Sequence, residues 1–351
     1  MATIYVSEQG AVISKTSRRL IISKDSAVIL ELPVFKVERI FIFGNIQLTT
    51  QAMNFLLENS IDVSFFTMGG KCHGRLTAME SKNIFLRLAQ YERYLDKEFQ
   101  INLAKTIVTI KLENEIELIY SFAKNYGISK FKETLVAIQK CKELLKSKAA
   151  IKSIMGIEGI AASYFFKAFK MMLRDENLVF NVRQKNPSVD PINSLLSFGY
   201  TLITNEILSV LIGQGFDPYI GFLHGINYGR PSLALDIVEE FRSAIDGFTL
   251  KLLNKAILTE DDFISTPDGT FLKPNSMKKY FIHYDKLMSP PNSDVDVNSN
   301  SNLKSKRLYI KDRVNMLRKS VIYKTEYAIS LNNRNHGIFP VSEGSILSDM
   351  Y

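Results

Sequence analysis

The segment 215–242, GFDPYIGFLHGINYGRPSLALDIVEEFR, combines a histidine with several carboxylates. His224 lies in its first half, where Gly, Pro and Asn residues predict a loop. A helix is expected after the loop, and on it Asp236 shares a face with Glu239 and Glu240, three and four residues later. Carboxylates that converge near a histidine are costly unless a cation neutralises them. The pattern therefore favours a cation site.

A second acidic position, Glu158, lies in the sequence IMGIEG. A helix is expected over Glu158–Leu173, with an apolar stripe at Ala161, Phe165, Ala168 or Phe169, and Met172. Glu158 precedes Ala161 by three residues and Phe165 by seven, so it falls on that stripe. A carboxylate on a buried face must be paired or bound to a metal. The position of Glu158 near a helix N-terminus would also favour its ionised form.

Each of these residues also has an ordinary explanation. A single histidine in a loop is commonly structural, acidic residues on an amphipathic helix commonly face solvent, and a glutamate in a first helical turn commonly caps the helix. Taken together, they are explained equally well by a metal site. Two carboxylates and one imidazole, with no thiolate nearby, favour Mg²⁺ or Mn²⁺ over Zn²⁺. Cys72 and Cys141 cannot form a structural zinc site, and Cys72-His73 is interpreted as a turn that ends a strand.

The elements that must position these residues change character along the chain. Up to about residue 75, alternation and β-branched content predict five strands, at Thr3–Val6, Leu20–Ser23, Ala27–Leu32, Arg39–Phe43 and Ile61–Phe66. One helix, Thr50–Asn59, is expected among them, capped by Thr49 or Thr50. From about residue 80 the apolar spacing becomes helical, which predicts further helices at Asp96–Ala123, Lys130–Lys146, Ile192–Ile212, Ser232–Leu253 and Lys304–Ser330.

This organisation predicts an α+β protein. A small β-rich N-terminal domain is expected at residues 1–80, followed by a larger all-α domain at 81–351. Residues 289–305, SPPNSDVDVNSNSNLKS, are rich in Ser, Asn, Pro and Asp, and this composition predicts a mobile loop.

Composition narrows the class of protein. The chain has 351 residues and a formal net charge of +8, which predicts one or two compact domains and favours nucleic acid over a membrane as a partner. No apolar run is expected to reach the length of a membrane span. The N-terminus alternates like a strand, unlike a signal peptide, and two cysteines are typical of a reducing compartment. A cytoplasmic protein is predicted.

Long stretches of the sequence resemble a known family. They include GNIQLTTQAMNFLLENSIDVSFFTMGGKCHGRL at 44–76, IMGIEGIAASYFFKAF at 154–169, and the whole segment 215–242. These residues resemble the CRISPR-associated integrase family, the universal endonuclease-like subunit of spacer acquisition, and the likeness covers most of the chain. The resemblance implies that the catalytic metal ligands are Glu158, His224 and Glu239. It implies a nearby acidic position at Asp236, and Glu240 is given a supporting or structural role.

The resemblance also implies a reaction and partners. A DNA 3′-hydroxyl would attack a backbone phosphate with the help of Mg²⁺ or Mn²⁺, which would join a short double-stranded DNA, the prespacer, to the CRISPR leader–repeat without ATP. A homodimer formed through the β-rich domain and a small second adaptation protein are implied as partners. Candidate DNA contacts are Arg230, Arg242, Lys304, Lys306 and Arg307. For further basic residues such as Lys111, an ordinary surface charge is the expected role.

Two alternatives stay open at this point. A metal-dependent nuclease that acts on branched DNA, with water as the nucleophile, would use the same site. A non-catalytic DNA-binding scaffold within a larger complex would not need Glu158 or His224 for activity. The C-terminal segment 335–351 does not follow the family pattern, which leaves DNA contacts there in doubt.

Overall fold

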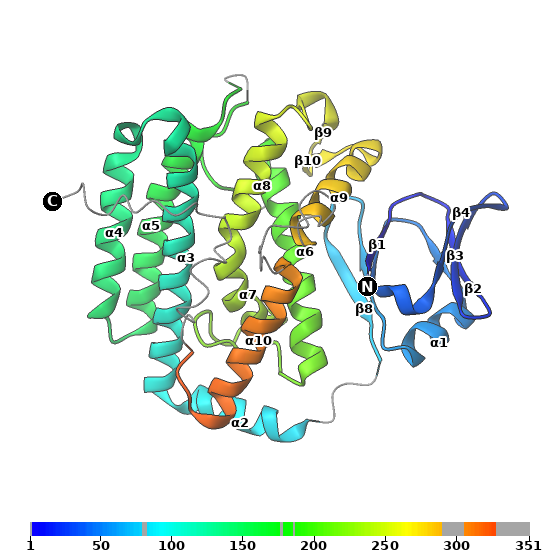
Figure 1. The fold of residues 1–351 in the computed structure, drawn as a ribbon, viewed down its shortest axis with the longest axis horizontal. Helices are drawn as coiled ribbons and strands as arrows, with labels where there is room; N and C mark the ends of the chain where they lie inside the picture. Colours follow the sequence, from blue (N-terminus) through cyan, green and yellow to red (C-terminus); the bar gives the residue numbers. More distant parts are fainter. Residues whose placement is uncertain (1, 79–82, 176–177, 185–186, 290–304, 328–351) are drawn as a thin grey trace, which may run out of the picture. The chain divides into compact units, whose positions relative to one another are not determined.

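The computed structural model of the protein describes residues 2–78, 83–175, 178–184, 187–289 and 305–327. Most of the predicted loop at 289–305 and the C-terminal segment 335–351 lie outside the described residues, as does the candidate DNA contact Lys304. The predicted α+β fold class is confirmed, because strands dominate before residue 77 and helices dominate after it (Figure 1).

Two four-stranded sheets form the N-terminal part of the chain. The strands of the first are β1 (Ala2–Val6), β5 (Val37–Phe43), β7 (Asp62–Phe66) and β8 (Cys72–Leu76). They pair in that order, with β8 antiparallel to β7 and the other pairs parallel. The strands of the second are β4 (Ala27–Pro33), β3 (Arg19–Lys24), β2 (Val12–Thr16) and β6 (Gln47–Leu48), again in spatial order. The β2–β6 pair is parallel and the other two are antiparallel.

One hydrophobic core joins the two sheets to helix α1 (Thr50–Glu58). Ile13 from the second sheet, Ile40 from the first and Leu56 from the helix are each at most 1% exposed. The Thr49 hydroxyl accepts the Ala52 N–H at 3.2 Å, which caps the helix as predicted. Burial of these branched apolar side chains is the main driving force that holds the strands in register.

All five predicted strands are confirmed within one or two residues, but others were missed. β2 has a short apolar run followed by Ser-Lys-Thr, and β6 has only two residues, so neither carries a clear alternation. Cys72 and His73 open β8, where a turn was predicted. A hairpin of β9 (Phe263–Thr266) and β10 (Gly269–Leu272) interrupts the region predicted to be all-α.

The six helices predicted after residue 80 are all present, but α2 and α9 were not predicted, and α5 and α10 each differ from the predicted bounds by seven residues at one end. The helices of this part of the chain are α2 (Ile84–Leu95), α3 (Lys97–Tyr126), α4 (Lys132–Lys146), α5 (Ile151–Met172), α6 (Pro191–Gln214), α7 (Ser232–Val238), α8 (Arg242–Asn254), α9 (Pro274–Met288) and α10 (Lys306–Tyr323). The Asp96 carboxylate accepts the Phe99 N–H and caps α3. α3, α4 and α5 pack side by side (Figure 1).

Two local differences from the predicted helices affect the acidic residues. α5 begins at Ile151, one residue after Ala150, so Glu158 lies in the middle of the helix and the predicted influence of a helix N-terminus is wrong. The helix predicted over 232–253 is two helices, because a 3₁₀ turn at Glu239–Phe241 separates α7 from α8. Adjacent side chains in a 3₁₀ turn diverge by about 120°, more than in an α-helix.

The described chain forms two compact units built from separate segments. The first contains residues 1–88, 175–218 and 252–289, and the second contains 89–174, 219–251 and the segment that follows 289. One element within the described residues, α6, is long and apolar enough to pass a test for a membrane span, contrary to the sequence expectation. Its most apolar window is 61% buried inside the protein, as is typical of a core helix.

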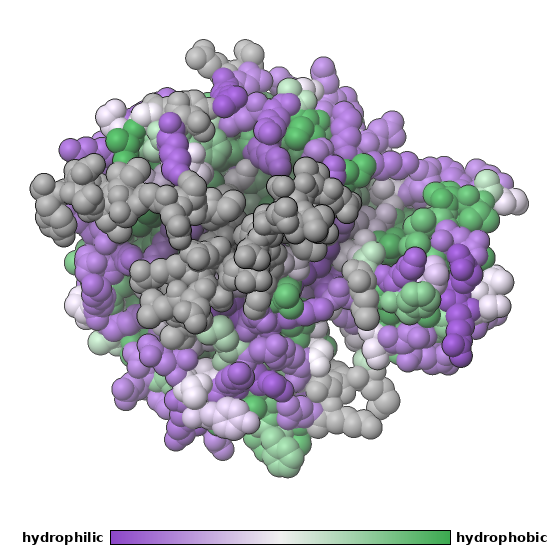
Figure 2. All heavy atoms as spheres, in the orientation of Figure 1, coloured by the Kyte–Doolittle hydropathy of each residue, from purple (hydrophilic) through white to green (hydrophobic). Residues whose placement is uncertain are grey.

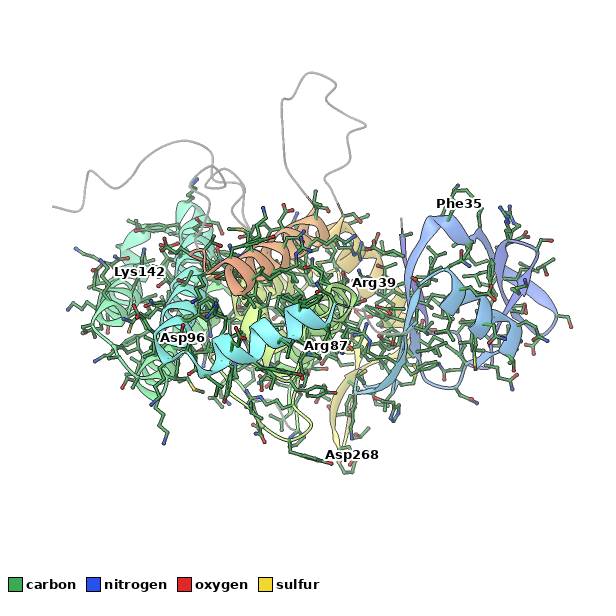
Figure 3. The ribbon with its side chains drawn as sticks, turned by 90° about the horizontal axis from the view of Figure 1, so that it is seen from below. Phe35, Arg39, Arg87, Asp96, Lys142 and Asp268 are labelled. Carbon is green, nitrogen blue, oxygen red and sulfur yellow. The ribbon has the colours of Figure 1, made fainter. Side chains whose placement is uncertain are left out.

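A buried ion pair links a strand to a helix within the first unit. Arg39 on β5 donates from Nη1 to Glu206 Oε2 on α6 at 3.0 Å, and the two side chains are 4% and 1% exposed. Figure 3 labels Arg39. A carboxylate that is left alone in such a place is strongly destabilising.

We expect Arg39→Met to lower the free energy of unfolding by about 3–5 kcal/mol, because the buried Glu206 carboxylate would lose the guanidinium that offsets its charge. Urea unfolding followed by circular dichroism measures this decrease in the free energy of unfolding. Arg19→Met is the matched control, since its pair with Glu31 is about half exposed and is expected to contribute less than about 1 kcal/mol. If Arg39→Met and Arg19→Met lower the free energy of unfolding equally, the Arg39–Glu206 pair is not the stabilising contact that its burial indicates.

Candidate metal centre

Four separate parts of the second unit bring charged side chains together. Lys111 comes from α3, Glu158 from α5, His224 from the loop before α7, and Glu239 from the 3₁₀ turn after α7. The Lys111 ammonium forms an ion pair with Glu158 Oε1 and a second, at 2.8 Å, with Glu239 Oε2. His224 Nε2 lies 3.8 Å from Glu239 Oε1. The three side chains predicted as metal ligands are therefore neighbours in space.

Asp236 fixes the loop that carries His224. Its carboxylate is fully buried and accepts the backbone N–H groups of Phe222, Leu223 and His224 at 2.5, 3.0 and 2.9 Å. The His224 ring donates from Nδ1 to Asp236 Oδ1 at 2.8 Å, because the carboxylate oxygen can only accept. Nε2 is the ring nitrogen that faces Glu239. A carboxylate behind a ring nitrogen is the usual support of a metal-binding histidine.

Gly221 allows this loop to pass close to α7. A Cβ atom at this position would lie 2.7 Å from the backbone carbonyl carbon of Ser232, closer than real Cβ contacts come. Two further glycines, Gly225 and Gly229, have φ values of +64° and +68°, which favour glycine. The glycine-rich sequence GFLHGINYG is thus explained by the path of the chain around His224.

Lys111 is the residue of this cluster whose role the sequence did not indicate. Its side chain is 5% exposed, although a solvent-exposed charge was expected. α3 is nearly uniform in hydropathy around its axis, so its periodicity does not mark the face on which Lys111 lies. The contact with Glu239 spans 128 residues of sequence, and no local pattern encodes it.

The charges around Lys111 and Glu239 shift their pKa values. Burial alone would raise the pKa of Glu239, but the cations Arg242 and Lys111 outweigh it and hold that pKa below the usual range. Burial would lower the pKa of Lys111, but the carboxylates of Glu239 and Glu158 raise it above its usual value. Lys111 and Glu239 are therefore charged at neutral pH.

Glu240 points away from this cluster and holds the turn in place. Arg313 on α10 donates to both Glu240 oxygens, from Nε at 2.6 Å and from Nη2 at 3.1 Å, and the Tyr327 hydroxyl donates to Oε1 at 2.7 Å. From the opposite side, Asn114 on α3 donates to the Glu240 backbone carbonyl at 2.8 Å. These contacts fit the structural role that the sequence analysis allowed for Glu240.

The predicted DNA-contact residues have different surroundings. Arg242 pairs through Nε with Glu239 Oε2 at 2.7 Å, so it borders the metal ligands. Arg230 is partly buried in the His224 loop. Lys306 and Arg307 begin α10, where burial lowers the pKa of Lys306 to about 8 and Arg307 is 9% exposed. Their contact with DNA stays a prediction.

The donor set suits a divalent cation. Glu158 and Glu239 supply carboxylate oxygens and His224 supplies a ring nitrogen, a combination that Mg²⁺ and Mn²⁺ accept. Among the described residues, no group of three or more His, Cys, Asp or Glu side chains lies close enough to form a ready-made cage. The cation that Glu158 and Glu239 share here is the ammonium of Lys111. An open groove of about 710 Å³ between α4 and α5 is lined by none of these residues.

Glu115 is a further carboxylate on α3, one helical turn after Lys111. It is 2% exposed, and burial raises its pKa to about 8. In the unfolded chain its pKa is close to 4.5, so the folded protein holds a proton that the unfolded chain releases between these two values. The stability that the protein gains from neutral Glu115 is fully present below pH 4.5, the pKa of this group in the unfolded chain. It is lost as the pH rises towards 8, the pKa in the folded protein.

We therefore expect the free energy of unfolding, measured in urea without divalent metal, to fall between pH 5 and pH 8. The fall attributable to Glu115 is at most about 1.4 kcal/mol per pH unit. Glu115→Gln should flatten this part of the profile, whereas Glu133→Gln, a change at an exposed position on α4, should leave it unchanged. If Glu115→Gln keeps the wild-type dependence of the free energy of unfolding on pH, Glu115 is not the group responsible for it.

Comparison with known proteins identifies the family. The family described as CRISPR associated protein Cas1 matches residues 4–286. The CRISPR-associated endonuclease Cas1 3 of Thermus thermophilus is 34% identical over 283 residues, which cover 80% of this chain and 82% of that protein.

Solved structures agree with this assignment. A Cas1 protein from Thermotoga maritima superposes with a TM-score of 0.76 at 26% identity, covering 92% of this chain and 97% of that one. A casposase bound to integration product gives a TM-score of 0.82 at 23% identity over 98% and 96% of the two chains, a likeness of fold. This chain belongs to the Cas1 family of CRISPR-associated proteins.

Proposed function

We propose that this protein is a divalent-metal-dependent DNA integrase and endonuclease of CRISPR adaptation, which inserts short DNA fragments into the CRISPR array. The observation that carries the proposal is the meeting of Glu158, His224 and Glu239, with Asp236 behind the histidine ring. Membership of the Cas1 family, whose relative in Thermus thermophilus is named an endonuclease, supports the reaction class.

Glu158, His224 and Glu239 are the residues that would hold Mg²⁺ or Mn²⁺. The bound ion would polarise the phosphate and stabilise negative charge on the attacking and leaving oxygens. Asp236 keeps the proton on His224 Nδ1, so that Nε2 presents its lone pair. Arg242 lies beside Glu239 and supplies a positive charge near the reacting phosphate. Arg230, Lys306 and Arg307 are proposed to bind the DNA backbone.

The reaction conserves the number of phosphodiester bonds. The oxygen of a DNA 3′-hydroxyl bonds to phosphorus as the bond from phosphorus to the leaving 3′-oxygen breaks. The proton of the attacking hydroxyl passes to solvent and the leaving oxygen takes one up, so no nucleotide hydrolysis is required. With water in place of the 3′-hydroxyl, the same residues would perform hydrolysis, which is the nuclease alternative.

A strand-joining assay distinguishes the candidate functions. The purified protein, with Mn²⁺, is given a leader–repeat duplex and a short DNA duplex that has free 3′-hydroxyls. We expect joined products from the wild type, and a loss of roughly a thousandfold or more in Glu158→Ala and His224→Ala, because a metal contributes several kcal/mol to transition-state stabilisation.

The controls separate catalysis from binding. Glu133→Ala, at an exposed position on α4, should keep wild-type joining, and all variants should keep DNA binding in a gel-shift assay. Cleaved strands without joined products would support the nuclease alternative. Full joining by both active-site variants would support the scaffold alternative and overturn the proposed metal site.

We also propose a homodimer through the β-rich part of the chain, together with a small second adaptation protein as a partner. β4 is an edge strand of the second sheet, and its Val28 and Ile29 are 60% and 51% exposed. Phe35, which follows β4, is 70% exposed and points away from the sheets in Figure 3. Figure 2 displays hydrophobic side chains over these strands. An apolar edge of this kind is typical of a surface that another chain covers.

If this edge is the dimer interface, the double variant Val28→Lys/Phe35→Glu should be a monomer in size-exclusion chromatography with light scattering. Charged side chains at the centre of an apolar interface lose hydration without gaining partners. Ile264→Lys, at a similarly exposed position on β9, is the control and should keep the wild-type mass. A dimeric double variant would rule out this edge.

A further inference from the structure

The burial of Lys111 requires an explanation that its position on α3 does not give. Lysine is almost never buried unless it is paired, and this side chain is 5% exposed. Its partners are two of the three proposed metal ligands, Glu158 and Glu239. One buried ammonium thus bridges two carboxylates that the proposed metal ion would also need.

We infer that Lys111 is a resident counter-cation of the metal centre, which competes with the divalent ion for Glu158 and Glu239 and moves to Glu115 when the ion binds. This inference rests on the proposed function. A divalent ion that takes oxygens from both glutamates cannot share them with an ammonium at hydrogen-bonding distance, because the two cations repel each other.

Glu115 is the acceptor that the fold provides for the displaced ammonium. It follows Lys111 by four residues on α3, so the two side chains lie on one helix face. Glu115 is 2% exposed, and its Oε2 has no hydrogen-bond partner. Rotation of the flexible lysine side chain brings its ammonium to Glu115. The nearby ammonium lowers the pKa of Glu115, so the carboxyl releases its proton to solvent and the positive charge stays paired inside the protein.

The competition has a measurable consequence for metal affinity. When a binding-competent arrangement is only fractionally populated, the apparent affinity falls by that fraction. Removal of Lys111 should therefore strengthen metal binding, although the same change removes a contact that holds Glu158 and Glu239. A purely structural role for Lys111 predicts the opposite, namely weaker metal binding after its removal.

Isothermal titration with Mn²⁺ on the full chain tests the inference. We expect Lys111→Met to bind Mn²⁺ roughly tenfold more tightly than the wild type, and Glu115→Gln to bind it roughly tenfold more weakly, which corresponds to about 1.4 kcal/mol in each case. In the double variant the effect of Glu115→Gln should vanish, because no ammonium needs an acceptor. Lys105→Met, six residues earlier on α3, is the matched control and should not change affinity.

Thermal unfolding with and without Mn²⁺ gives a second readout. Lys111→Met should melt at a lower temperature without metal, because two carboxylates repel each other, and Mn²⁺ should raise its melting temperature by more than that of the wild type. Should Lys111→Met fail to fold, Glu115→Gln with Lys111 intact still tests the inference.

The outcomes separate this inference from the proposed function. If Mn²⁺ binds the wild type and binding is lost in Glu158→Ala, but Lys111→Met binds no more tightly, the inference alone is wrong. It is equally wrong if Glu115→Gln weakens binding to the same extent with and without Lys111. If the wild type binds no Mn²⁺, or if Glu158→Ala binds as well as the wild type, the proposed metal site itself is wrong.

Discussion

The carboxylates of Glu158, which is 25% exposed, and Glu239, which is 4% exposed, both contact the ammonium of Lys111, which offsets their repulsion. Two like charges at short range in a low-dielectric interior cannot both stay ionised without a cation. The pairing requires α3, α5 and the 3₁₀ turn after α7 to lie against one another, because each supplies one charged group. It also explains why the cluster suits a divalent ion, since an arrangement that holds one cation between two carboxylates offers the same oxygens to another.

A second set of buried charges keeps the first in place. Glu239 and Glu240 are neighbours in sequence but face different surroundings, because they lie in a 3₁₀ turn between two α-helices. Glu239 faces Lys111 and Arg242, whereas Glu240 is fully buried against Arg313 and Tyr327. The fork of Arg313 matches the two oxygens of Glu240, which fixes the turn more firmly than a single contact would. Asp236 does the same for the loop of His224 through its contacts with three backbone N–H groups.

Local sequence pattern predicted part of this site and part of the fold. Helical spacing correctly indicated that Ala161, Phe165, Ala168, Phe169 and Met172 are buried on α5, but Glu158 itself is 25% exposed, so its predicted place on the buried stripe is wrong. The choice of Glu158, His224 and Glu239 as ligands came from family resemblance. Lys111 could not be predicted, because its role depends on packing between segments far apart in sequence. Short strands such as β6, and the hairpin β9–β10, were missed because they carry too few alternating residues.

The long sequence separations within the metal centre have a consequence for the biosynthesis of the protein. Lys111 contacts Glu158 across 47 residues, Asn114 contacts Glu240 across 126, and Arg313 reaches back across 73. Contacts between residues that are so far apart in the sequence form late in folding, because a long loop must close before they are made. A nascent chain, or a proteolytic fragment without α10, therefore lacks the contact of Arg313 with Glu240. The contacts that hold the turn carrying Glu239 are therefore complete only after α10 and Tyr327 have been synthesised.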